Sequence, residues 1–499
     1  MIKTHIGIAL QTDPQTNSAP ARIVIVGGGF TGVAYAIHLL RLSTQPLAIS
    51  IVEPAAELAR GIAYGTDAPE HRINVPSDRM SLFGSHATHA TEWFFEQGIL
   101  PDAPSTDARG HHYVSRASYG LYVQDILRQT LAAAGARVQW RHLRDQVASI
   151  AATPEQGSRY QVRLAGGEWL PADIVVLAFG HATPALPCPV SSAALAHPGF
   201  FPNPWQPNAV SGVDADADVL LVGTGLTMAD VFVSLLRGGH RGGITAISRR
   251  GLLSHAHGQF IDNIDFLEGQ AAPQTARALL RLIRRRVQRD APAMGWHPVL
   301  DSVRSQLHKL WQALPPEQRR RAVRRLLPFW EVHRFRAAPQ VHGAVAAARD
   351  GGRLAVIKAG IGGIEVAQQR LLCTLQLREG SGAPVQQGER KQAFDAVILC
   401  TGPEKNIARN PLISSLLDAG LVRLDEVGIG LDVDARSRVL NAQGEVVEGL
   451  FAYGPMTRGT FGEMTGAPNI TVHIEQLLRR HDPLSRTSSQ DVREVLACE

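Results

Sequence analysis

The sequence predicts an α/β fold, in which buried parallel strands alternate with helices. Two short apolar runs, Ile23–Val26 and Val219–Val222, each lead directly into a glycine-rich turn. A buried strand, a tight turn and the start of a helix, in that order, are typical of a dinucleotide-binding unit. The third observation is a region between residues 261 and 344 that is dense in arginine and has helical periodicity. These features predict two Rossmann-like domains and a basic, all-helical insert.

The first glycine-rich turn has the spacing G-x-G-x-x-G at the end of an apolar strand. Gly27 permits the tight turn, Gly29 lets the backbone approach a pyrophosphate, and Gly32 allows the helix to pack closely on the strand. A helix beginning near Phe30 would direct its positive end at the phosphates. We therefore expect the whole turn to bind a dinucleotide, through Gly27, Gly28, Gly29, Phe30, Thr31 and Gly32.

The charge that follows this turn indicates which dinucleotide is bound. The next strand, Ala48–Val52, ends on Glu53, which lies 21 residues after Gly32. A carboxylate at this distance accepts hydrogen bonds from an unphosphorylated ribose diol. The sequence therefore predicts FAD at the first turn.

The second turn predicts a different coenzyme. The strand that follows this turn, Ile244–Ser248, is succeeded by Arg249 and Arg250. Two guanidinium groups favour a 2′-phosphate over a bare diol, so we expect NADPH here. Met228 stands where the third glycine belongs, and we expect a slightly wider contact between helix and strand. The predicted coenzyme-binding residues of this part are Gly223, Gly225, Leu226, Thr227, Arg249 and Arg250.

Composition limits the classes of protein that this chain can be. With 499 residues, 44% of them apolar, it can bury two or three cores. No run approaches the roughly 18 apolar residues of a membrane span, so we expect a cytoplasmic protein without a membrane partner. The four cysteines are too far apart for a C-x-x-C pair, so bound cofactors must carry any electrons. Close histidine pairs lack metal-ligand spacing, so we expect no metal site, and the lack of a G-x-S-x-G motif argues against a serine hydrolase.

The excess positive charge of the chain is concentrated in the predicted helical insert. The net charge is +5, and arginines cluster at 284–289 and 319–325. Leu279, Ile283 and Val287 share one helix face, which leaves the arginines on other faces. We interpret them as a solvated surface of amphipathic helices and expect no nucleic-acid partner. A further possibility is that their field attracts the polyanionic NADPH.

The order of strands predicts that the second dinucleotide domain is inserted into the first. A buried strand at Ile174–Gly180 precedes a proline-rich connector, and a similar strand at Phe394–Gly402 ends the second domain. The chain then returns through Phe451–Gly454 to a closing helix at Ala467–Leu478. The expected units are a disordered tail at 1–20, an FAD-binding domain in two parts at 21–205 and 391–485, an NAD(P)H-binding domain at 213–390 with a helical insert at 261–344, and a C-terminal tail at 486–499.

Four segments carry a resemblance to a known group of proteins. They are His71–Phe83, Ser248–Leu253, Phe329–Arg336 and Gly454–Glu463. From about residue 22 to 480 the chain resembles bacterial FAD/NAD(P)-binding oxidoreductases with two dinucleotide-binding domains. More distantly, it is similar to flavin-dependent N-hydroxylating monooxygenases and to thioredoxin-reductase-like flavoproteins.

The resemblance implies that FAD is bound in the first domain and that NADPH arrives at the second. It implies that one segment lines the isoalloxazine ring and that residues 458–463 approach the pyrimidine edge of the ring. An ordinary polar loop is the alternative for the first segment, and an ion pair between Arg458 and Glu463 is the alternative for the second. The residues that the resemblance adds to the cofactor sites are Asn74, Val75, Pro76, Ser77, Arg79, Met80, Gly180, Thr401, Gly402, Gly454, Arg458 and Thr460.

Two residues depart from the pattern of these flavoproteins. Pro455 follows Gly454 where an aspartate normally holds the flavin side chain, and Phe179 replaces a threonine before Gly180. The resemblance therefore implies flavin binding with a changed set of hydrogen bonds to the cofactor.

Three functions are compatible with this sequence. The first is an NADPH-dependent flavin monooxygenase that uses molecular oxygen to hydroxylate a small nucleophilic amine. The second is a flavin reductase or NADPH:acceptor oxidoreductase without oxygen insertion, and the third is a non-catalytic flavin-binding module. The lack of a C-x-x-C pair argues against dithiol chemistry, and the lack of an F-x-G-x-x-x-H motif argues against ketone oxidation. The substrate itself leaves no recognisable motif.

Overall fold

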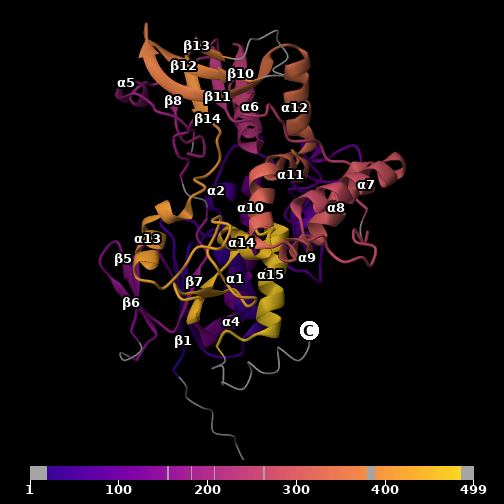
Figure 1. Ribbon diagram of the computed structural model, residues 1–499. Helices are drawn as coiled ribbons and strands as arrows, with labels where there is room; N and C mark the ends of the chain where they lie inside the picture. The colour runs from indigo at the N-terminus through magenta and orange to yellow at the C-terminus, as the bar shows by residue number, and fades with distance from the viewer. Residues whose placement is uncertain are drawn as a thin grey trace, which may run out of the picture.

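Segments from both ends of the described chain meet in one sheet, and the middle of the chain builds another (Figure 1). The computed structural model describes residues 19–153, 157–180, 183–206, 208–261, 264–378 and 388–484. The predicted tail at 486–499, and all but the last two residues of the tail at 1–20, lie outside the described residues.

The first sheet has six strands in the order β15-β16-β7-β1-β2-β3. The strands β1, β2, β3, β7 and β16 pair in parallel, and only β15 runs antiparallel to its neighbour. Their inner positions are filled by valine, isoleucine and leucine, as parallel sheets covered on both faces require. The bounds are β1 Ala21–Val26, β2 Leu47–Val52, β3 Val138–Leu143, β7 Ile174–Leu177, β15 Arg438–Leu440 and β16 Val446–Ala452.

The second sheet has seven strands in the order β13-β12-β11-β10-β9-β14-β8. Strands β8, β14, β9, β10 and β11 are parallel, and β11, β12 and β13 continue as an antiparallel meander. The bounds are β8 Phe200–Phe201, β9 Val219–Val222, β10 Ile244–Ser248, β11 Leu354–Ala367, β12 Arg370–Leu377, β13 Gly388–Phe394 and β14 Ala396–Leu399.

Helices cover the first sheet and position its glycine turn. Helix α1 (Phe30–Leu42) follows β1 and packs against α4 (Arg116–Ala134) and α15 (Ala467–Arg480). A small antiparallel sheet of β4 (Val147–Ala152), β5 (Tyr160–Leu164) and β6 (Trp169–Ala172) precedes β7. The predicted closing helix is thus confirmed as α15, which returns the chain to α1.

The segment between β10 and β11 contains helices and, within its described residues, no strand. Phe266, Leu300 and Trp311 belong to its own small apolar core. Figure 1 shows the helices between residues 296 and 334 beside the first domain, near α14 (Arg458–Phe461) and α15. The bounds are α7 Ala276–Met294, α8 Trp296–Ser305, α9 Leu307–Gln312, α10 Pro316–Arg325, α11 Leu327–Arg334 and α12 Pro339–Asp350. Helix α12 packs on α6 (Leu226–Arg237) and β11, and so belongs with the second sheet.

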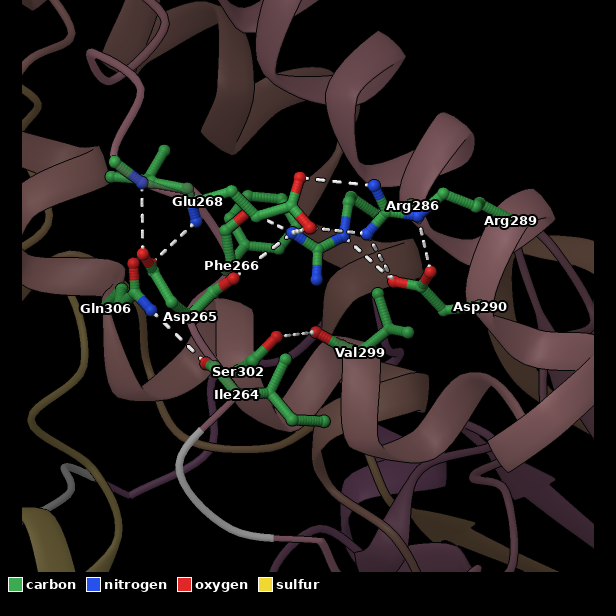
Figure 2. A network of polar contacts seen from close by, with 12 residues as sticks. Ile264, Asp265, Phe266, Glu268, Arg286, Arg289, Asp290, Val299, Ser302 and Gln306 are labelled. Carbon is green, nitrogen blue, oxygen red and sulfur yellow. Dashed lines mark hydrogen bonds and ion pairs between the residues drawn. The ribbon is translucent and has the colours of Figure 1, made fainter.

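One arginine of the insert contradicts the expectation of a solvated surface. Arg286 is buried, and its guanidinium donates to the carbonyl oxygens of Asp265 and Phe266 and pairs with Asp290 at 2.9 Å (Figure 2). A buried guanidinium is tolerated only where acceptors surround it, and this loop and helix provide them. The neighbouring Arg284 and Arg285 are exposed, as expected. The interpretation as a solvated surface residue is therefore wrong for Arg286, which joins α7 to the loop at residues 265–266.

The predicted fold class is confirmed. Strands from 21–177 and 438–452 share one sheet, while the parallel β9, β10 and β14 lie in another, so one α/β unit is inserted into the other. In Figure 1 the indigo and yellow ends of the chain lie together, away from the second sheet.

Candidate functional site

The first glycine turn is shaped so that only glycine fits at two of its positions. Gly27 has a φ of +102°, and a Cβ there would lie 2.6 Å from the Cα of Phe179. A Cβ on Gly32 would overlap the carbonyl oxygen of Gly27. The turn therefore brings the N-terminus of α1 directly over the end of β1, where Gly27 N–H donates to Val52 O at 2.9 Å.

The N-terminus of α1 is open to a ligand. Its N-cap residue, Gly29, has no side chain to accept hydrogen bonds from the first turn, so those N–H groups have no capping acceptor. A Cβ on Gly29 would meet only the Cα of Gly61, at 3.7 Å, among the described residues. Free backbone donors, the positive end of a helix and open space are what a pyrophosphate requires.

Glu53 stands beside this turn at the end of β2. Its Oε2 accepts from Gly28 N–H at 2.9 Å, and its Oε1 accepts from Ala55 N–H at 3.1 Å. Each carboxylate oxygen keeps a second lone pair, so the group can still accept from a hydroxyl pair. The two backbone donors hold the carboxylate in one orientation next to the loop.

The segment from Asn74 to Met80 is held by packing and differs from an ordinary solvated loop. Ser77 is buried and shares a 2.7 Å hydrogen bond with Thr91, and Met80 O accepts from the hydroxyl of Tyr119 at 2.8 Å. His257, which follows β10, contacts the Asn74 carbonyl oxygen through Nε2 at 2.9 Å. The segment thus lies where the two domains meet. The other predicted residues in it are Val75, Pro76 and Arg79.

The predicted residues between 454 and 460 follow β16, and this strand of the first sheet places them near the first glycine turn. Gly454 has a φ of +78°, and a Cβ there would lie 2.7 Å from Thr31 Oγ1 in the first turn of α1. Arg458 and Thr460 follow in α14, only partly exposed. Gly180, by contrast, is exposed and has no described atom within 4 Å of a Cβ position.

The alternative of an ion pair between Arg458 and Glu463 is wrong. Glu463 is buried and pairs with Arg334 of α11, while Arg458 Nε donates to the Ile429 carbonyl oxygen at 3.1 Å. The competing partner comes from the helical insert, more than a hundred residues away. Burial lowers the pKa of Arg458, and Glu331 and Asp425 partly oppose that effect.

The second glycine turn repeats the geometry of the first. Gly223 has a φ of +126°, and a Cβ there would lie 2.7 Å from the carbonyl carbon of Cys400. Gly225 is the N-cap of α6, has no side-chain cap, and has no described atom within 4 Å of its Cβ position. Leu226 and Thr227 form the first turn of α6, and Met228 is buried in the core.

Two more predicted residues, Thr401 and Gly402, lie beside this turn at the end of β14. Thr401 and Gly402 follow β14, which pairs in parallel with β9. The Thr401 hydroxyl is buried without a hydrogen-bond partner among the described residues, and Gly402 has a φ of +78°. A buried hydroxyl with no partner is a position that a ligand can satisfy.

Arg249 and Arg250 line a hollow of about 630 Å³ at the end of β10. The Arg250 guanidinium lies 4.7 Å from the centre of the Phe329 ring, and its Nη1 is buried without a partner among the described residues. The full lining consists of Arg249, Arg250, Leu252, Phe329, Lys358, Leu377 and Arg378. Four cationic side chains and one aromatic ring suit an anionic, ring-bearing ligand.

Sequence reasoning missed Phe329, Lys358 and Arg378 as members of this hollow. Lys358 follows the apolar run Leu354–Ile357 and lies opposite Ser248 in the register of β10 and β11. A charge directly after a short apolar run, level with the end of the neighbouring parallel strand β10, is a signal that could have identified it. Arg378 N–H donates to Lys358 O at 3.0 Å, but that antiparallel register leaves no signal in the sequence.

Two absences hold for the part of the chain that the structure describes. In it, no three histidine, cysteine, aspartate or glutamate side chains gather as metal ligands would. None of its helices is both long and apolar enough to cross a membrane.

Comparisons with known proteins agree with this geometry. Residues 24–182 match the model of a family described as FAD-NAD(P)-binding. An L-aspartate N-monooxygenase (nitrosuccinate-forming) from Streptomyces cremeus is 29% identical over 297 residues, which cover 49% of this chain and 44% of that protein. The match therefore spans less than half the length of this curated relative.

Two solved structures share the fold over nearly the whole chain. L-lysine 6-monooxygenase from Pseudomonas syringae superposes with a TM-score of 0.59 at 18% identity, covering 94% of this chain and 100% of that one. Ornithine N-hydroxylase from Kutzneria sp. 744, described with reduced FAD, NADP+ and L-ornithine, has a TM-score of 0.59 at 15% identity, covering 93% and 99%. The resemblance predicted from the sequence is confirmed, and residues 24–182 form an FAD-NAD(P)-binding domain.

Proposed function

We propose that this chain is an FAD-dependent, NADPH-using monooxygenase that hydroxylates the amino nitrogen of a small substrate. The observation that carries the proposal is the pairing of two open glycine turns with opposite charges, Glu53 beside the first and Arg249 with Arg250 beside the second. The aspartate, lysine and ornithine enzymes named above support amine hydroxylation as the reaction.

The residues of the first turn fit FAD. The first turn of α1, from Gly29 to Gly32, offers uncapped N–H donors to the pyrophosphate, and Gly29 leaves space for it. Glu53 offers its free lone pairs to the ribose diol. Two segments approach the same end of α1. Gly454, which precedes α14, lies against Thr31. Tyr119, whose hydroxyl donates to Met80 O, has its ring centre 6.1 Å from that of Phe30. These two segments would hold the isoalloxazine ring.

The residues of the second turn fit NADPH. Gly223 permits the tight turn, Gly225 offers open backbone at the start of α6, and Thr401 offers a hydroxyl with no partner among the described residues. Arg249, Arg250 and the lysine and arginine beside them suit the 2′-phosphate, while Phe329 offers a ring face to the adenine.

Bound FAD supplies hydride acceptance and oxygen activation, and the protein supplies placement and electrostatics. In the overall reaction, NADPH gives up a hydride, which carries two electrons, and becomes NADP+. One atom of molecular oxygen is inserted into an N–H bond of the amine to give a hydroxylamine. The other oxygen atom leaves as water, which takes up the hydrogen of the hydride and one proton from solution. The task of the chain is to align the coenzyme with the flavin and to exclude bulk water from both. The buried contacts around Ser77 and Met80 serve that task by making the flavin-lining segment rigid.

The test uses the full chain, its absorbance spectrum and its products. We expect a yellow preparation whose FAD is bleached anaerobically by NADPH. With oxygen and L-aspartate as the first amine tried, followed by other amino acids, we expect one N-hydroxylated product per NADPH consumed. NADPH oxidation that yields only hydrogen peroxide with every amine would favour an oxidoreductase without oxygen insertion. A chain that is colourless and does not bind added FAD would refute the proposal.

A further inference from the structure

Two arginines of the helical insert reach the N-terminus of α15. Arg304 lies near the end of α8 and Arg334 at the end of α11. A Cβ on Gly466, the N-cap of α15, would lie 3.2 Å from Arg304 Nη2 and 3.7 Å from Arg334 Nη2. Both guanidiniums therefore point at the same backbone position. Gly466 has no side chain that could cap the helix, so the positive end of α15 adds to their charge.

Arg334 is only partly satisfied by its neighbours. Its side chain is 4% exposed, pairs with Glu463, and donates to Thr465 Oγ1 at 2.7 Å. Its Nε is buried and has no hydrogen-bond partner among the described residues. A guanidinium carries five N–H donors, and each buried donor that is left without a partner is costly.

The charge of Arg304 is balanced by fewer neighbouring acceptors than that of Arg334. The hydrogen bond described for its guanidinium is to the neutral Asn469 side chain, Nη2 to Oδ1 at 2.7 Å, and no described carboxylate lies within ion-pair distance. The nearby Asp301 is already engaged by Arg336 through two hydrogen bonds, of 3.0 and 2.8 Å. Burial lowers the pKa of Arg304, the charge of Asp301 partly opposes that effect, and the like charges of Arg336 and Arg79 lower the pKa further.

The local balance of charge is therefore positive without a ligand. Among the described residues, Glu463 is the one carboxylate that pairs with Arg304 or Arg334. Burial and the charge of Arg304 lower the pKa of Arg334, and Glu331 partly opposes them. A partly buried cation without an anionic partner is unfavourable, and a carboxylate is the group that a guanidinium fork matches best. An anionic ligand group at this place would complete the site.

We infer that Arg304, flanked by Arg334 and the N-terminus of α15, binds a carboxylate of the substrate. The substrate class is an amine that also carries a carboxylate, an amino acid, in contrast to a diamine. This inference rests on the proposed function and adds its substrate class. The site adjoins the segment 458–463, because Arg334 pairs with Glu463, and this segment is the one expected to approach the flavin.

The inference is tested by titrating the full chain with ligands, without NADPH and therefore without turnover. By calorimetry we expect L-aspartate to bind and 1,5-diaminopentane to bind at least about tenfold more weakly. Arg304→Gln should weaken L-aspartate binding by about 10- to 100-fold, because a charge-assisted pair is lost. Arg304→Lys, which keeps the charge and loses the fork, should give an intermediate loss. The matched control is Arg284→Gln, an exposed arginine of the same insert, which should change binding less than about twofold.

The outcomes separate this inference from the proposed function. Unchanged L-aspartate affinity in Arg304→Gln, or equal binding of the diamine to the unaltered chain, would overturn the inference while leaving the flavin chemistry intact. Loss of flavin absorbance or of NADP+ binding in Arg304→Gln, with L-aspartate affinity retained, would assign the arginine to a cofactor instead. A colourless preparation would refute the proposed function, and the same titration would still decide the role of Arg304. Thermal melting of each variant establishes that it is folded.

Discussion

At the scale of single residues, the two glycine turns differ in the charge at the end of the strand that follows each of them. Glu53 is held by the Gly28 and Ala55 N–H groups, so its position beside the first turn is set by backbone. Arg250 is held by the Phe329 ring and keeps one buried nitrogen without a partner among the described residues. The proposed assignment of FAD to one turn and NADPH to the other rests on these charges, because a carboxylate suits a diol and guanidinium groups suit a phosphate.

The paired change Arg249→Ala with Arg250→Ala should weaken NADPH far more than NADH. Two charge-assisted contacts are lost, so we expect about 2 to 4 kcal/mol for NADPH and little for NADH. Dissociation constants for both coenzymes measure the effect. Arg349→Ala is the control, because that side chain is 52% exposed on α12 of the same domain. An equal loss for both coenzymes would contradict the assignment of a 2′-phosphate to these arginines.

At the scale of elements, the pairing of α1 with α15 depends on a buried, neutral histidine. His38 of α1 is 2% exposed and shares a 3.0 Å hydrogen bond with Thr471 of α15, whose hydroxyl donates to Leu82 O at 2.9 Å. Burial lowers the pKa of His38 to about 4, against the opposing charge of Glu475. The helix that presents the first glycine turn is thereby sensitive to acid.

Stability should fall as the pH falls from about 6.5 to about 4. Above this range His38 is neutral in both states; within it the unfolded chain takes up a proton that the folded chain refuses. Between pH 7 and pH 5 this one group should remove on the order of 2 kcal/mol from the free energy of unfolding. Urea unfolding measures it. His38→Gln should reduce the loss, His86→Gln on the surface should not, and an unchanged loss in His38→Gln would contradict the prediction.

At the scale of the whole molecule, α6 ties the second glycine turn to the first domain. Asp230 of α6 pairs with Arg116 of α4 at 2.7 Å, with both side chains largely buried. Ser234 of the same helix donates to Glu70 at 2.9 Å and contacts His71 at 2.9 Å. On the other side, Trp311 of the insert donates to the Gly459 carbonyl oxygen at 2.7 Å. The relative placement of the two turns is therefore determined by contacts between distant segments.

Breaking the ion pair between Asp230 and Arg116 should slow hydride transfer from NADPH to the flavin, while FAD stays bound. Asp230→Asn leaves Arg116 unpaired and loosens α6, so we expect flavin reduction at saturating NADPH to slow about 10- to 100-fold. Anaerobic bleaching of the flavin absorbance measures the rate. Asp216→Asn breaks a pair with Arg241 whose side chains are 69% and 68% exposed, and it should have almost no effect. Similar slowing in both variants would contradict a positioning role for Asp230.

The sequence by itself determined the elements and their order. Strands β1 and β9, the starts of α1 and α6, and the closing helix α15 all lie where the sequence predicts them. Each depends on local properties, namely apolar runs and glycines whose positive φ a short turn demands. The insertion of one α/β unit into the other followed from the order of those strands.

Only the tertiary structure decided which charged side chains meet. It buried Arg286 in the insert, paired Glu463 with Arg334, and set Lys358 and Arg378 beside Arg250. Apart from the pair of Arg286 with Asp290, these contacts join residues that are far apart in the sequence. A charged residue in a helix pattern looks the same whether it faces water or a partner. The physical reason is that the free energy of a charge depends on its burial and on its nearest opposite charge, and both are fixed only when distant segments pack together.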